Sequence, residues 1–136
     1  MTPFLLGVLA YLAPTFVLGF VWHLVLFKKA YAALAMYRSD VIIPFGFLSM
    51  LIQAIVFAWL YRSAFLGQGG SVIVRVALYS ACGAALSWSF TTLAVAAKNV
   101  MTSVPGYVRI ETAFTAVQWL MVGPLTVLAF QIGARG

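Results

Sequence analysis

Residues 41–61, VIIPFGFLSMLIQAIVFAWLY, form an apolar run without a charged side chain. A helix needs about 20 such residues to cross the ~30 Å hydrocarbon core of a bilayer. Three further runs are similarly apolar, at residues 4–27, 76–97 and 110–134, with Glu111 as their one charged side chain. Because a lipid-exposed backbone must satisfy its own hydrogen bonds, we predict an all-α fold: one domain over residues 1–136, built as a bundle of four transmembrane helices.

The composition excludes a soluble globular protein. Charged residues make up 7% of the chain and hydrophobic residues 65%, whereas about a quarter of a typical soluble domain is charged. The eight Lys and Arg lie near the ends of the apolar runs, where such residues anchor helices at the membrane edge. We therefore expect the lipid bilayer as a partner and no nucleic acid.

Positive charge differs between the two sides of the predicted bundle. The first and third connections contain Lys28, Lys29, Arg38, Lys98 and Arg109. The opposite side contains Arg62, Arg75 and Arg135. Because cytoplasmic loops carry the excess of Lys and Arg, this bias places the first and third connections in the cytoplasm and both termini outside. The first run follows no positive region typical of a signal peptide, so we expect it to remain as a span.

Two connections contain features of their own. The first, between Lys28 and Asp40, can form a short interfacial helix with Tyr31 and Tyr37 at headgroup depth. The third contains Pro105 followed by glycine and is predicted to be irregular.

Small and polar residues recur at helical spacing within three runs, and they predict which faces meet. In lipid, helices associate through close packing of small residues and through interhelical hydrogen bonds. We expect these stripes to pack together as a left-handed bundle with a modestly polar interior. The stripes are Gly46, Ser49 and Gln53; Ser80, Gly83, Ala84, Ser87 and Thr91; and Glu111, Thr115 and Gln118.

The only histidine, His23, lies four residues before the membrane edge at Phe27, which is ~6 Å along a helix. Glu111 is predicted at a similar depth, because its helix starts from the same side. Ionisable residues within a span are candidates for function, and a His23–Glu111 contact can carry a proton or bind a polar group. In the structural alternative, which the shallow depth favours, Glu111 pairs with Arg109 or Lys98 at the interface, and His23 snorkels toward the membrane surface or bonds a loop carbonyl.

Residues for metal, redox or hydrolytic chemistry are few. One histidine, one cysteine and two acids on different helices do not provide the three or four ligands of a usual metal site. Cys82 stands alone, which excludes an intrachain disulfide. No phosphate-binding loop or nucleophile motif is present. We therefore predict a protein that is not an enzyme and has no cofactor or metal.

A short motif, Gly19-x-x-Trp22 followed by Phe27, lies late in the first run. It resembles a domain-of-unknown-function family of small four-helix bacterial inner-membrane proteins, which carries a G-x-x-W-Y pattern and a later Phe in this helix. Here His23 stands where that family has tyrosine. The resemblance implies the four-helix fold and a bacterial inner-membrane location, and it implies no activity.

Two functional hypotheses follow. The first is a non-enzymatic membrane protein that acts through helix–helix contacts, as a homo-oligomer or as a small accessory subunit of a larger membrane complex. The alternative is a protein that binds or transports a small molecule, lipid, quinone or pigment in a polar site near His23 and Glu111. The residues predicted to line that site are Trp22, His23, Gln53, Trp88, Glu111 and Gln118.

Overall fold

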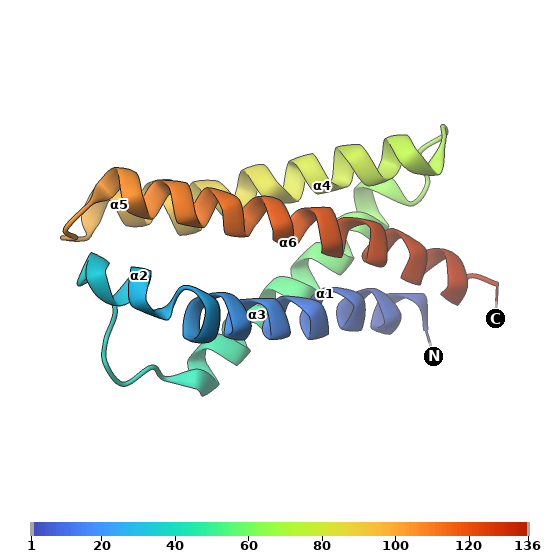
Figure 1. The fold of residues 1–136 in the computed structure, drawn as a ribbon. Coiled ribbons are helices and arrows are strands. Elements are labelled where there is room, and N and C mark those ends of the chain that lie inside the picture. Colours follow the sequence, from blue (N-terminus) through green and yellow to red (C-terminus); the bar gives the residue numbers. More distant parts are fainter. Residues whose placement is uncertain (1, 136) are drawn as a thin grey trace.

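The computed structural model describes residues 2–135, which form helices and loops without a strand (Figure 1). The helices are α1 (Pro3–Phe20), α2 (Lys28–Leu34), α3 (Ile43–Leu60), α4 (Val72–Trp88), α5 (Ala94–Lys98) and α6 (Val104–Gly133). Three π-helical segments, η1 (Val21–Leu26), η2 (Tyr61–Phe65) and η3 (Ser89–Leu93), continue α1, α3 and α4.

Within the described residues, four continuous helical stretches are long and apolar enough to cross a membrane: Pro3–Leu26, Ile43–Phe65, Val72–Lys98 and Val104–Gly133. The predicted all-α fold with four membrane-spanning helices is confirmed, and it indicates a multi-pass membrane protein.

The fourth span begins at Val104 rather than at residue 110, so the prediction of an irregular third connection around Pro105 was wrong. The Ser103 side chain caps α6 by accepting a hydrogen bond from the Gly106 amide at 3.1 Å. Proline is tolerated in the first turn of a helix because the amide it lacks would have no partner there. Ser71 similarly caps α4, which starts four residues before the predicted residue 76.

Helices α1 and α6 lie side by side and antiparallel at the centre of the bundle (Figure 1). Helix α3 packs on α1, and α4 packs on α6, so two hairpins meet along the α1–α6 contact. The starts of α2 and α6 lie at one end, and the start of α4 and both described chain ends lie at the other (Figure 1).

The small-residue face of α4 packs closely on another helix, as predicted, but it meets Trp119 and Gly123 of α6 rather than the predicted stripe of that helix. Gly83 lies directly against the Trp119 ring, where a Cβ atom would overlap it. Ser87 accepts a hydrogen bond from the Trp119 indole at 3.1 Å. One turn away, the glycine is on α6 instead: a Cβ atom on Gly123 would overlap the Ser80 side chain of α4. Close packing and a hydrogen bond therefore hold α4 to α6, as expected for helices in lipid.

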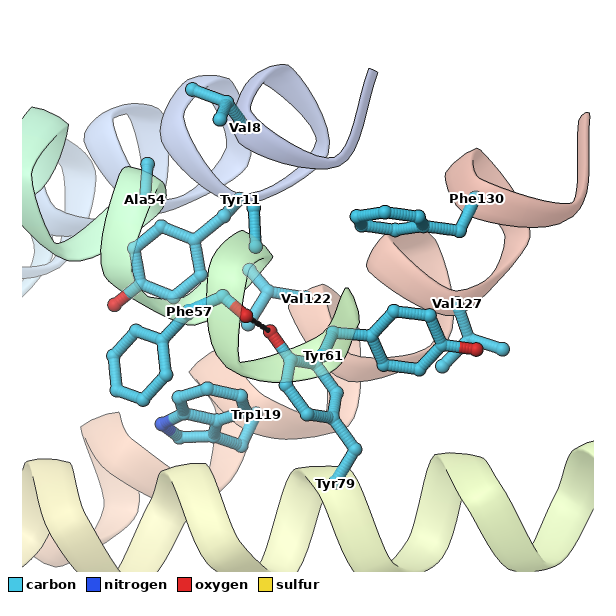
Figure 2. Close-up of a cluster of buried hydrophobic side chains, with 11 residues drawn as sticks. Val8, Tyr11, Ala54, Phe57, Tyr61, Tyr79, Trp119, Val122, Val127 and Phe130 are labelled. Carbon is cyan, nitrogen blue, oxygen red and sulfur yellow. Dashed lines mark hydrogen bonds between the residues drawn. The ribbon is translucent and has the colours of Figure 1, made fainter. Parts of the chain in front are cut away.

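Aromatic side chains from four helices fill the centre of the bundle (Figure 2). The Trp119 ring packs edge-on against Phe57 at 4.8 Å and against Tyr79 at 5.6 Å between centroids. The Tyr79 hydroxyl donates to the Phe57 carbonyl at 3.1 Å (Figure 2). The core is therefore a packed aromatic layer, with its polar contacts confined to a few hydrogen bonds.

Candidate functional site

The backbone around His23 fixes the orientation of its ring. His23 lies in η1, and its Nδ1 atom is 2.9 Å from the Gly19 carbonyl oxygen. A carbonyl oxygen only accepts hydrogen bonds, so Nδ1 carries a proton and donates it. This bond leaves the second ring nitrogen, Nε2, free to face another helix.

His23 Nε2 faces Glu111 Oε1 at 3.2 Å, which brings α6 and η1 together. With Nδ1 protonated, Nε2 of a neutral ring and the oxygen of a carboxylate are both acceptors and would repel. A proton must therefore lie between them, on the imidazole or on the carboxyl group. The pair can hold one exchangeable proton within a membrane-spanning segment.

Glu111 is 4% exposed and accepts further hydrogen bonds from the first connection. The Tyr31 hydroxyl donates to Oε1 at 2.6 Å, a short, charge-assisted bond when the carboxyl group is ionised. The Tyr37 hydroxyl is 3.5 Å from the same oxygen, at the limit of a hydrogen bond. One oxygen atom thus links α6 to η1, to α2 and to the loop that follows α2.

The backbone of the first connection brings both tyrosines to Glu111. Ala35 has a φ of 56°, in the left-handed region, and this residue ends α2 and reverses the chain. Thr102, in the loop before α6, donates its hydroxyl to the Ala33 carbonyl at 2.7 Å and its amide to the Leu34 carbonyl at 3.1 Å. These bonds satisfy the last carbonyls of α2 and hold it against the start of α6.

The two tyrosines lie outside the membrane-spanning segments, and both are harder to ionise than usual. Burial raises the pKa of the Tyr31 phenol, and its hydrogen bond to Glu111 raises it further. Partial burial raises the pKa of Tyr37, which is 45% exposed, and the nearby negative charge of Glu111 raises it further. Both phenols therefore stay neutral donors across physiological pH.

Glu111 does not form the predicted ion pair with Arg109 or Lys98 at the membrane edge. Among residues 2–135, the ion pairs are His23–Glu111 and an exposed Arg38–Asp40 pair at 2.9 Å, and Arg109 and Lys98 form neither. The interpretation that pairs Glu111 with one of those cations was wrong. A buried carboxyl group instead turns inward to neutral donors and to the one histidine.

The two predicted glutamines belong to a second network, nearer the middle of the bundle. The Tyr11 hydroxyl donates to Gln53 Oε1 at 3.0 Å. Gln118 Nε2 donates to the Tyr11 hydroxyl at 3.1 Å and lies 3.4 Å from the Thr15 hydroxyl. These neutral groups join α1, α3 and α6, which is the interhelical role that amides commonly have in membranes.

The two predicted tryptophans are also separated. The Trp88 indole donates to Thr112 at 2.8 Å on the α4–α6 contact. Trp22 packs against Phe27 and Phe114, and Phe114 in turn packs against His23. The six predicted site residues therefore fall into three contact groups rather than around one shared space, and ligand binding by them stays a prediction.

Tyr31 and Tyr37 are the site residues that the sequence did not identify. Their place at headgroup depth stays a prediction, and within the protein Tyr31 is buried against Glu111. Within residues 2–135, no group of three His, Cys, Asp or Glu side chains is arranged to hold a metal ion.

Comparison of the chain with models of protein families, with curated proteins and with solved structures found no match.

Proposed function

We propose that this chain is a non-enzymatic membrane protein that acts through lateral contacts of α3, as a homo-oligomer. The observation that supports this most directly is the outer face of α3. Gly46 and Ser49 were predicted to meet another helix, yet both are exposed, and a Cβ atom on Gly46 would meet no other atom within 4 Å. Small residues of this kind let a second helix approach closely.

The same face contains polar groups that water does not reach in a lipid environment. Gln53 Nε2 donates to the Ser49 hydroxyl at 3.0 Å, and both side chains line a shallow groove of about 330 Å³ with Phe45, Leu48 and Ile52. Within residues 2–135 these bonds leave the second Gln53 amide proton and the Ser49 hydroxyl proton available, and a donor that faces hydrocarbon without a partner is unfavourable. A helix of a second copy placed in this groove supplies both packing and hydrogen bonds.

The filled aromatic core also favours this function over transport through a single chain. Tyr11, Phe57, Trp119 and Tyr79 pack together where a pore of a four-helix bundle would run (Figure 2). Contacts between chains need no such opening. The same lateral contacts could instead join this chain, as a small accessory subunit, to a larger membrane complex.

The test is native mass spectrometry of protein extracted gently from its own membrane. Gly46→Leu is the decisive variant, because its side chain enters open space and leaves the single-chain fold intact. Ala116→Leu, on the exposed face of α6, is the matched control. We expect an oligomer that dissociates in Gly46→Leu and persists in Ala116→Leu. A wild-type chain that is monomeric and free of other subunits would overturn the proposal.

A second candidate function is proton binding coupled to a small ligand at the His23–Glu111 pair. It rests on the Nδ1 bond to Gly19, which requires a proton between Nε2 and Glu111. Nitrogen NMR of labelled histidine across pH 5–9 tests it directly. An imidazole that gains or loses its Nε2 proton together with Glu111 supports this function, and a ring whose state never changes would exclude it.

We propose a bacterial inner membrane as the location, with both termini outside. The five-to-three bias of Lys and Arg toward the first and third connections supports the orientation. The resemblance in the Gly19-x-x-Trp22 motif supports the membrane. Labelling of single cysteines introduced into the loops of intact cells tests the orientation.

A further inference from the structure

A groove of about 400 Å³ lies between the end of the second span and the start of α4. This is the opposite end of the bundle from the start of α6 and its Glu111 site (Figure 1). Arg75, Gln68 and Gly69 form one part of the groove, and Phe65, Leu78 and Cys82 form the apolar part. A cation and an apolar surface therefore border the same space at the edge of a span.

The Arg75 guanidinium has few partners within the chain. Its Nη1 atom donates to the Leu66 carbonyl at 3.5 Å, and its buried Nε has no hydrogen-bond partner in the part of the chain that the structure describes. The chain contains only two acidic side chains, and both are engaged elsewhere: Asp40 with Arg38, and Glu111 with His23. A guanidinium has five donors, so most of its bonding capacity is available to a ligand.

We propose that this groove binds one anionic phospholipid, with its phosphate at Arg75 and an acyl chain along Leu78 and Cys82. A planar guanidinium matches the geometry of phosphate oxygens and forms paired hydrogen bonds with them. Leu78 and Cys82 lie three and seven residues after Arg75, on one side of α4, and lead from the membrane edge toward its interior.

The rim of the groove has room for a headgroup. A Cβ atom on Gly69 would meet no other atom within 4 Å, so the space beside it is open. Gln68 provides an amide at the same rim. The apolar part alone gives no preference for any lipid, because its surroundings are equally apolar. Selectivity for an anionic headgroup therefore depends on Arg75.

The test measures lipid adducts on the intact chain by native mass spectrometry in detergent. Phosphatidylglycerol is titrated against phosphatidylcholine of the same acyl length, with inorganic phosphate as a separate competitor. Arg75→Gln removes the charge, and Arg62→Gln is the matched control, an exposed arginine at the same end that does not line the groove. Ala64 also lines the groove, and Ala64→Trp places a large apolar side chain there while keeping Arg75.

We expect one phosphatidylglycerol per chain, bound about fivefold more weakly in Arg75→Gln and unchanged in Arg62→Gln. Ala64→Trp also weakens binding, and it decides the outcome if circular dichroism shows that Arg75→Gln does not fold. Equal binding of the two lipids, or of wild type and both groove variants, overturns the proposal. Displacement of the lipid by millimolar phosphate does so too, because the site is then specific for the free anion.

Discussion

Two polar networks cross the bundle, and they differ in the chemistry of their members. The middle network joins Gln53 and Gln118 through Tyr11, and every group in it is neutral. The end network joins His23 and Tyr31 to Glu111 and contains ionisable groups. Neutral amides and hydroxyls hold helices together in one state, whereas a pair that shares a proton has two. The protonation chemistry, rather than the amount of polarity, distinguishes the candidate functional site.

Removing the carboxyl group has the largest expected effect. Glu111→Ala deprives the buried Tyr31 hydroxyl of its acceptor and leaves His23 Nε2 without its partner. We expect a loss of about 3 kcal/mol in the free energy of unfolding, because the buried Tyr31 donor and the His23 Nε2 atom are both left without a partner. Denaturant titration in detergent micelles measures it.

The loss should also be local to the first connection. Hydrogen exchange of residues 28–34 should rise more in Glu111→Ala than exchange in α4, because α2 is held to α6 through Glu111. Unchanged exchange in α2 would show that Thr102 alone holds this helix.

Tyr31→Phe has the next largest effect. It removes a 2.6 Å hydrogen bond to a carboxyl oxygen and keeps the ring that packs against His23. We expect a loss of about 2 kcal/mol in the free energy of unfolding. Tyr37→Phe is the matched control, since its hydroxyl lies at 3.5 Å from the same oxygen and should contribute little. Equal losses in the two variants would contradict the assigned geometry.

Alkaline pH should weaken the end network through the same phenol. The pKa of Tyr31 is raised in the folded protein, first by burial and then by Glu111, whereas an unfolded tyrosine titrates near pH ~10. The stability that Tyr31 provides is therefore complete below pH ~10 and falls as the pH rises above it. Wild type should lose about 1 kcal/mol more than Tyr31→Phe between pH 9 and pH 11. Parallel stability curves for the two proteins would refute this.

The sequence predicted the spans well because hydropathy over about 20 residues is a strong signal. It also placed His23 and Glu111 at one depth, because antiparallel helices bring the end of one span beside the start of another. The close packing of the small-residue stripe with Gly83 could also be predicted, because a spacing of three and four residues places side chains on one face of a helix.

The partners of Glu111 could not be predicted. Tyr31 reaches it only because the first connection folds back as α2 and reverses at Ala35, a non-glycine residue in a left-handed conformation. Such conformations depend on the surrounding packing rather than on local propensity. The start of α6 was missed because Pro105 was interpreted as a loop residue although it also suits a first helical turn.

Gln118→Leu has the smallest expected effect on stability, and it tests whether the neutral middle network has only a structural role. The substitution removes the amide donor to Tyr11, but the Tyr11 hydroxyl still donates to Gln53. Thr15 is left able to bond a carbonyl of its own helix. We therefore expect a loss of only about 0.6 kcal/mol, and the same change in stability with pH as in wild type. A loss as large as that of Tyr31→Phe, or an altered pH dependence, would mean that the middle network is coupled to the His23–Glu111 pair through α6, and the distinction between a structural and a functional network would fail.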